Sequence, residues 1–440
     1  MTRLPGGAAP RREVAAWCLF DFANSSYTTL IVTVAFSVYF REAVVGASNP
    51  QGDFLWGLAG ILVNGILILT SPILGAIADH SGRKKLFLFL TVAQTVGATA
   101  LLGLVREGQV SRGLFLYVVA SVGFEAGYIF YNAFLPEVST RETIGKISSL
   151  AWGAGFLGGL ASLVACAPFI GRPLTDPSGM LVAEAAGDYR VSFVVVALFF
   201  ALFSMPTLLI LRESPRDKGL ARLADYAREG FRRVGDTLAH LRRYRETAKY
   251  VLAYVCFFGG INTVIRFSAI YASQTFQIRG RDLLALFVVT NLIAVPGTIV
   301  AGWLADRIGH KTTLVLTLLL WLGVAIMGAT ARGKVSFWLM AAGAAVGMGS
   351  TQSVGRSYMA RLSPPGRESE FFGFYVLAGQ LGSIVALLTF GVVSSGTGNQ
   401  RLAVLWTVPF FAAGLLLTLF IRETPPRALA VERPDPGSAR

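Results

Sequence analysis

The sequence has few charged residues, few cysteines and few histidines for its length. Charged side chains make up 15% of the 440 residues, and the chain holds three cysteines and three histidines. So low a charged fraction excludes an ordinary soluble globular protein. The cysteines fall within apolar runs without metal-ligand spacing, and the histidines lie far apart in loops. We therefore expect reduced core cysteines and no metal site.

Motifs of nucleotide-driven or catalytic proteins are also missing. The sequence contains no nucleophile with an accompanying base, no glycine loop that would cradle a phosphate, and no ATP-binding signature. We expect neither an enzyme nor a bound cofactor. Any work that the protein performs should draw on a gradient of an ion or of its substrate.

Long apolar runs dominate the chain, and hydrophobic residues make up 54% of it. A run of about 20 apolar residues is long enough to cross a bilayer as a helix. The first run has no small-residue cleavage pattern after it and contains polar residues, so it predicts a helix and not a signal peptide. Twelve runs are predicted, at 14–40, 54–78, 84–105, 113–136, 147–170, 191–211, 248–276, 283–305, 312–331, 335–361, 370–394 and 402–421.

One polar turn between apolar runs occurs twice, as GAIADHSGRK at 75–84 and as GWLADRIGHK at 302–311. The repetition predicts an all-α polytopic membrane protein whose twelve helices form two pseudo-symmetric six-helix bundles. The expected organisation is a tail at 1–13, a bundle at 14–211, a linker at 212–247, a second bundle at 248–422 and a tail at 423–440.

This repeated turn resembles the loop signature of the major facilitator superfamily. The resemblance implies that Asp79, Arg83, Asp306, Arg307 and Lys311 gate the protein. Each aspartate would then meet basic residues and a helix N-terminus in one conformation and leave them in the other. A histidine stands at one usually basic position in each copy, which bears on the strength of the gate.

The formal net charge of +14 does not indicate a nucleic-acid partner, because Lys and Arg are confined to segments between apolar runs. Most of them fall on the side that carries both chain ends. The positive-inside rule predicts that both termini are cytoplasmic. We expect an integral, multi-pass protein of the plasma (inner) membrane. We expect a monomer whose positive segments face an anionic inner leaflet.

Linker 212–247 combines apolar residues at helical spacing, from Leu220 to Leu241, with many arginines. Such a pattern predicts a basic amphipathic helix on the cytoplasmic side. Two placements are open at this point. The helix lies on the inner leaflet, or it packs on the protein's own loops.

Four ionisable residues fall inside predicted spans, where a charge is costly unless it is paired or faces water. They are Asp21, Glu125, Arg266 and Arg356, with Asp21 and Arg356 nearer the cytoplasmic boundary and the other two nearer the midplane by helical rise. Their helices, the first, fourth, seventh and tenth, line the central cavity in the superfamily that this chain resembles. The expected substrate-binding set is Asp21, Asn24, Glu125, Tyr128, Asn132, Asn262, Arg266, Gln352 and Arg356. Glu125 paired with Arg266 would hold the two ends of a small zwitterion; the alternative is that the two only bond to each other as a staple between helices.

Helices one and seven are matched copies, because CLFDFAN at 18–24 aligns with CFFGGIN at 256–262. Gly259 therefore replaces Asp21 in the second half, which makes the cavity chemically asymmetric. The pair Gly259-Gly260 allows either a bend in the helix or the close packing of a neighbour.

Three stretches carry a narrower resemblance: DFANSSY at 21–27, NAFLPE at 132–137 and the segment 352–372. They are similar to the bacterial branch of the vacuolar amino-acid effluxer family within the major facilitator superfamily. That resemblance implies a secondary transporter that works by alternating access and exports small zwitterions such as amino acids or short peptides, with protons as a possible coupling ion. Two alternatives are kept: an exporter of drugs or lipid-like solutes, and a receptor or scaffold that transports nothing.

Overall fold

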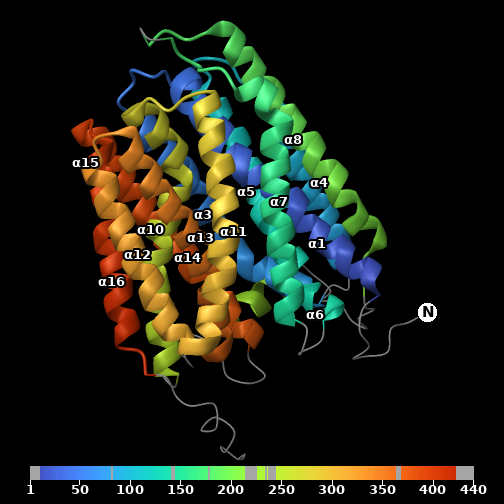
Figure 1. Ribbon diagram of the computed structural model, residues 1–440. Helices are drawn as coiled ribbons and strands as arrows, with labels where there is room; N and C mark the ends of the chain where they lie inside the picture. Colours follow the sequence, from blue (N-terminus) through green and yellow to red (C-terminus); the bar gives the residue numbers. More distant parts are fainter. Residues whose placement is uncertain are drawn as a thin grey trace, which may run out of the picture.

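A computed structural model of the chain describes residues 10–80, 83–139, 144–176, 179–213, 225–232, 235, 244–362 and 368–422. These residues form an almost wholly helical protein (Figure 1). Ten of the described helices are long and apolar enough to cross a bilayer. The first helix and α13 complete the set of twelve. The first is divided by π-helical turns into shorter helical segments, and the many glycine, serine and other polar residues of α13 lower its hydropathy, which explains why length and hydropathy alone do not select them.

Six spans make up the first bundle. Their bounds agree with the predicted runs to within a few residues, except that α8 begins at Ala183 and not at 191. The polar residues of its first turns, Glu184 and Asp188 among them, conceal this start in the sequence. The elements are α1 (Arg11–Ser26) with its continuation, α3 (Gly52–His80), α4 (Lys84–Leu102), α5 (Val110–Asn132), the short α6 (Leu135–Val138), α7 (Ile144–Ile170) and α8 (Ala183–Ile210).

The second bundle also has six spans, and its helix bounds follow the predicted runs closely. Its last span is made of two helices separated by a turn at Trp406 and Thr407. The elements are α10 (Arg245–Phe276), α11 (Arg281–Ile308), α12 (His310–Thr330), α13 (Lys334–Leu362), α14 (Glu368–Thr397), α15 (Gln400–Leu405) and α16 (Val408–Leu419).

The first span changes helix type along its length. After α1 it continues as η1 (Tyr27–Val34), α2 (Ala35–Tyr39) and η2 (Phe40–Val44), where η1 and η2 are π-helical. The Thr33 hydroxyl donates to the Thr28 carbonyl oxygen at 3.0 Å, across the five-residue spacing of a π-turn. π-Helical turns are rare and often occur at functional sites. Here they lie on the helix that was expected to contribute Asp21.

Helix α1 begins and α16 ends on the same side of the molecule, at the bottom of Figure 1. We call this side the terminal face. The opposite side, where η2 ends and α3 begins, is the far face. Both copies of the repeated turn, between α3 and α4 and between α11 and α12, belong to the terminal face because the helices alternate in direction.

The two bundles are sealed together toward the far face. One buried apolar cluster fills the first bundle and continues into the second through Phe267, Ile270 and Leu387. A separate cluster, which includes Tyr250, Phe257 and Trp321, is confined to the second bundle. Toward the terminal face, α1 packs on α7 and α8 of its own bundle, whereas α2 and η1 pack on α10. The first span therefore meets the second bundle mainly through η1 and α2, and α3 also packs along α14.

A described part of the linker packs on the protein itself. Residues 225–232 are helical, and Tyr226 packs against the first apolar cluster. Gly230 lies so close to the carbonyl oxygen of Pro72 in α3 that a Cβ atom would collide with it. This arrangement favours the second expectation for this stretch, a helix packed on the transporter. Most of 212–247, including Leu220 and Leu241, lies outside the described residues.

Candidate functional site

A cavity of about 480 Å³ lies between the two bundles. Its walls come from α1, η1, α5 and α7 of the first bundle and from α10 to α16 of the second. Six of the nine expected substrate-binding residues line it: Asp21, Asn24, Glu125, Tyr128, Gln352 and Arg356. Its volume lies within the range of ordinary small-molecule sites, about 300–1,000 Å³.

Charges of both signs meet around Tyr128. This tyrosine lies within electrostatic reach of Asp21 and Glu125, and its hydroxyl is paired with the guanidinium of Arg356. The same guanidinium lies over the indole of Trp152, 5.2 Å from the ring centroid. Arg356 belongs to the second bundle, whereas Tyr128 and Trp152 belong to the first. The cavity therefore has an acidic wall and a basic wall that lie on opposite bundles.

Glu125 and Arg266 do not form the expected pair across the cavity. Glu125 lines the cavity and, among the described residues, takes part in no salt bridge. The guanidinium of Arg266 points elsewhere: its Nη1 donates to the hydroxyl of Tyr117 at 2.6 Å. The side chain is buried, and its Nε has no hydrogen-bond partner in the described structure. The two charges interact at longer range, and Arg266 is absent from the cavity lining.

Two expected amides are also turned away from the cavity. Asn132 donates from Nδ2 to the carbonyl oxygen of Tyr128 at 2.8 Å, and Asn262 donates from Nδ2 to the hydroxyl of Ser383 at 2.7 Å. Neither residue lines the cavity. The amides instead hold the end of α5 and the contact between α10 and α14. With Arg266, they are the three expected site residues that the structure keeps apart from the others.

The expected gating residues lie at the terminal face, and their neighbours differ. The side chains of Asp79 and Asp306 lie outside the described residues. Arg83 is exposed, and Arg307 lies 4.0 Å above the ring centroid of Trp303. The ammonium group of Lys311 donates to the carbonyl oxygens of Leu419 and Ile421 at 2.9 and 2.6 Å.

Lys85 repeats the contact of Lys311 in the first bundle. Its ammonium group donates to the carbonyl oxygens of Leu209 and Leu211 at 3.3 and 2.9 Å. Both lysines thus satisfy carbonyl groups left unpaired at a helix C-terminus, where the helix dipole also favours a cation. The match shows that Lys85, and not Lys84, is the structural counterpart of Lys311.

Lys84 serves a different purpose at the start of α4. Its buried ammonium group pairs with Glu137 and donates to the carbonyl oxygen of Ala133 at 3.1 Å. Its backbone N–H bonds to Glu213, just after α8. Burial raises the pKa of Glu213, while the N–H groups of Lys84 and Lys85 oppose that shift. These contacts give the NAFLPE motif a structural role, since its glutamate binds Lys84, which joins the start of α4 to the end of α5, to α6 and to the residues after α8.

Polar contacts between the bundles gather at the far face around Asp53. The buried carboxylate of Asp53 receives Arg41 Nε from its own bundle at 3.1 Å. From the other bundle it receives Gln400 Nε2 at 2.8 Å and the hydroxyl of Ser394. Nearby, the indole N–H of Trp56 donates to the Arg266 carbonyl oxygen at 3.0 Å. We call Arg41, Asp53, Ser394 and Gln400 the Asp53 cluster.

Comparison with known proteins identifies the family. The profile of a family described as "Vacuole effluxer Atg22 like" matches residues 60–144 and 137–427. The chain belongs to this family of the major facilitator superfamily. The MFS-type transporter YxiO of Bacillus subtilis is 29% identical over 414 residues, covering 94% of this chain and 95% of the relative. Autophagy-related protein 22 of Kluyveromyces lactis is 21% identical over 367 residues, covering 77% of this chain and 72% of the relative.

A solved structure supports the same fold. A variant of the nucleoside transporter NupG superposes with a TM-score of 0.69 at 11% identity, covering 93% of this chain and 100% of the other. The Atg22-like chain therefore has the twelve-helix major facilitator fold and is a multi-pass membrane protein related to transporters. Both levels of resemblance drawn from the sequence are confirmed.

Several cavity residues of the Atg22-like protein were not predicted. Ser25, Thr28 and Thr29 line the cavity from the first span, and the SSYTT stretch after Asn24 was a usable signal for them. The aromatic walls had no such signal, because Phe and Trp are common on every apolar helix. The aromatic lining residues that were not predicted are Phe124, Trp152, Phe156, Tyr254, Phe258, Phe267, Tyr271, Phe287, Trp321, Phe337, Tyr375, Phe390 and Phe411.

Proposed function

We propose that this Atg22-like protein is a secondary active transporter that exports small zwitterions, amino acids or short peptides, by alternating access. The observation that carries the proposal is the distribution of charge in the central cavity. Asp21 and Glu125 stand on one bundle and Arg356 on the other. A solute with an ammonium and a carboxylate group can satisfy both walls at once, which a solute of one sign cannot.

Arg356 is the proposed partner of the substrate carboxylate. A guanidinium offers a planar fork that suits a carboxylate. Trp152 and Tyr128 fix its orientation from the opposite bundle. Arg266 is unsuited to this role in the described conformation, because its Nη1 is engaged by Tyr117 and its side chain does not line the cavity.

The aromatic walls support a solute with an apolar portion. Phe258, Phe287 and Phe390 stand among many apolar lining residues. The same observation favours a second candidate function, the export of amphipathic cations, for which a single cavity carboxylate would suffice. The two candidates differ on Arg356, because a cation gains nothing from a guanidinium.

Alternating access is proposed from the sealing of one face. The apolar cluster and the Asp53 cluster join the bundles at the far face, while α1 stays with its own bundle at the terminal face. Transport would require the far-face contacts to break as the terminal face closes. From the positive-inside rule, the terminal face with both termini is proposed to be cytoplasmic, and the membrane to be the plasma (inner) membrane.

Counterflow into proteoliposomes tests the substrate class. Vesicles containing the purified full chain and one unlabelled solute receive radiolabelled amino acids, dipeptides, sugars or cationic dyes. We expect saturable uptake of an amino acid or dipeptide, and no uptake of the matching amine that lacks the carboxylate. Arg356→Gln should reduce the apparent affinity by about tenfold or more, since a charge-assisted bond is lost. Arg332→Gln, an exposed position at the far face, is the matched control.

Two results would contradict the proposal. Uptake of dyes without amino acids would favour the amphipathic-cation exporter. Unchanged affinity in Arg356→Gln would leave the carboxylate without its proposed partner.

Proton coupling is tested separately with an imposed pH gradient. Asp21→Asn should lose gradient-driven accumulation and keep some counterflow, because counterflow is driven by the solute gradient and needs no gradient of the coupling ion. Full gradient-driven transport in Asp21→Asn would move the proton role to Glu125 or end it.

A further inference from the structure

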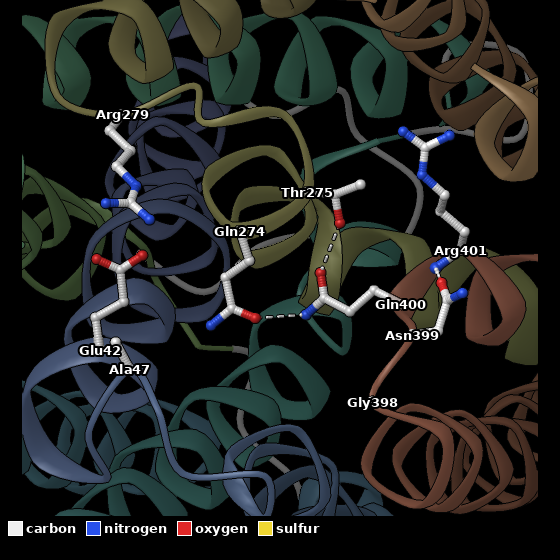
Figure 2. A pocket seen from close by; sticks show the side chains of 9 residues that line it. All are labelled: Glu42, Ala47, Gln274, Thr275, Arg279, Gly398, Asn399, Gln400 and Arg401. Atoms are coloured by element: carbon white, nitrogen blue, oxygen red, sulfur yellow. Dashed lines mark hydrogen bonds between the residues drawn. The ribbon is translucent and has the colours of Figure 1, made fainter. Parts of the chain in front are cut away.

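A second pocket opens at the far face, on the seam between the bundles. It encloses about 370 Å³. The first bundle contributes the stretch around Glu42, and the second contributes the end of α10 with Arg279 and the turn before α15 (Figure 2). Nearly every lining side chain is polar, in contrast to the aromatic central cavity. We call it the seam pocket.

Two opposite charges face one another in the seam pocket without closing on each other. Figure 2 shows the carboxylate of Glu42 and the guanidinium of Arg279 pointing toward one another. In the described structure no salt bridge joins them. Glu42 is only 4% exposed, so its carboxylate is held in place by the fold.

Each charge is anchored on one side and open on the other. The carboxylate of Glu42 accepts the hydroxyl of Ser273 from the opposite bundle. Arg279 donates from Nη1 to the hydroxyl of Thr175 at 2.7 Å and from Nε to the Ser273 carbonyl oxygen at 3.3 Å. Nη2 of Arg279 has no partner among the described residues. Both groups are thus oriented but incompletely satisfied.

The charge pattern selects the kind of ligand. A simple cation at Glu42 would be repelled by Arg279 and Arg41, and a simple anion at Arg279 would be repelled by Glu42. Gln274 adds an amide beside the gap; its oxygen accepts Gln400 Nε2 at 2.8 Å. We propose that the seam pocket binds a small, polar zwitterion from the far compartment, with its ammonium group at Glu42 and its carboxylate at Arg279.

The seam pocket is distinct from the central cavity. None of its lining residues is shared with that cavity. A ligand here would touch both bundles while the far face is closed. By linkage, its binding would favour that conformation.

The test is equilibrium binding of radiolabelled glycine to the purified full chain in nanodiscs. Glu42→Gln and Arg279→Gln should each weaken one class of glycine site by about tenfold or more, since each removes a charge-assisted contact. Glu107→Gln and Arg332→Gln, which remove exposed charges from the same face, should bind as the wild type does. Ser273→Ala should also retain binding, because it breaks the bond between the bundles but leaves both charges.

Competition with compounds that carry only one of the two charges of glycine tests whether the seam pocket requires a zwitterion. Acetate and methylammonium, each alone at the glycine concentration, should displace little glycine. Full displacement by acetate would mean an anion site, and full displacement by methylammonium a cation site. Either result would overturn the proposal, as would unchanged binding in both Glu42→Gln and Arg279→Gln.

An Arg356→Gln background separates this site from the proposed transport site. Seam-pocket binding should survive in that background and disappear when Glu42→Gln is added. If the central cavity takes no glycine, Arg356→Gln will change nothing, and the loss caused by Glu42→Gln will still be seen. Loss of all binding in Arg356→Gln alone would leave the seam pocket without a ligand.

Discussion

Replacing Asp53 by Asn should shift the protein away from the conformation that is closed at the far face. The carboxylate holds Gln400 and Ser394 across the seam. A hydrogen bond to a charged group contributes about 1.5–3 kcal/mol and a neutral one about 0.5–1.5 kcal/mol. Two such reductions sum to about 2 kcal/mol, or roughly a 30-fold change in the equilibrium between closed and open far faces.

The bond from Arg41 to Asp53 has a different consequence. Both residues belong to the first bundle, so this bond persists in either conformation and does not affect the equilibrium between them. It does affect folding: if the one amide oxygen of the introduced asparagine keeps Gln400 and Ser394, its NH2 group faces Nε of the buried Arg41, and two donors make no hydrogen bond. Arg41 would keep the carbonyl oxygens of Gly46 and Ala47 at 2.9 and 3.2 Å. We therefore expect a lower Tm for Asp53→Asn, but a folded protein.

The assay is the distance between spin labels on the two bundles at the far face. Ser48 and Arg332 are both exposed there and suit replacement by cysteine, in a chain whose three native cysteines are replaced. Asp53→Asn should populate a longer distance. The control is Asp282→Asn, which removes an acid from the same face whose partner Lys334, at 3.7 Å, belongs to the same bundle. An unchanged distance distribution, or an equal change in Asp282→Asn, would refute the reasoning.

Three further predictions concern the terminal face. Asp79→Asn and Asp306→Asn should slow transport with little loss of stability, because each removes a charge at a loop end without making a cavity; wild-type rates in both would reduce these loops to connectors. Lys85→Met and Lys311→Met should each lower stability by about 1 kcal/mol through unpaired helix-end carbonyls, seen as a lower Tm, and equal Tm values would contradict that role. A cysteine at Arg222 should resist an impermeant reagent applied to intact cells; its labelling from outside would reverse the proposed topology.

The helices were predictable because hydropathy fixes them almost alone. A span must satisfy its backbone hydrogen bonds internally, so every long apolar run becomes a helix. The start of α8 was placed too late, because Glu184 and Asp188 interrupt the apolar pattern at the membrane edge. The π-helical turns of η1 and η2 were not foreseen, since a change from four-residue to five-residue spacing leaves no mark in composition.

The direction in which a site residue points was not predictable from the sequence. Helical rise gives the level of Arg266, but each residue also turns the helix by about 100°. Asn262 and Arg266 are four apart, so they share a face of α10, and that face meets α14 and the first bundle. Thr263 and Phe267 share the neighbouring face and line the cavity. Because α10 is apolar on most sides, the sequence does not mark which face meets the cavity.

The asymmetry between Asp21 and Gly259 has a physical cause in helix packing. In the first bundle, Gly158 of α7 lies against the Phe22 carbonyl oxygen of α1. A glycine on α7 alone is sufficient for these two helices to approach closely. In the second bundle the corresponding helices, α10 and α14, each contribute a glycine to the contact. Gly382 of α14 lies against the Val255 carbonyl oxygen of α10, and Gly259 of α10 lies against the Gly382 carbonyl oxygen.

A side chain at 259 would therefore collide with the backbone of α14. Gly260 is similarly covered, since a Cβ atom there would lie 2.9 Å from the ring of Phe411. The glycine pair thus serves close packing, and α10 cannot present a carboxylate at the position that Asp21 occupies in α1. Because α10 packs so closely on α14, the charge that the second bundle brings to the cavity must come from another helix. In this protein that helix is α13, and the charge it supplies is the guanidinium of Arg356.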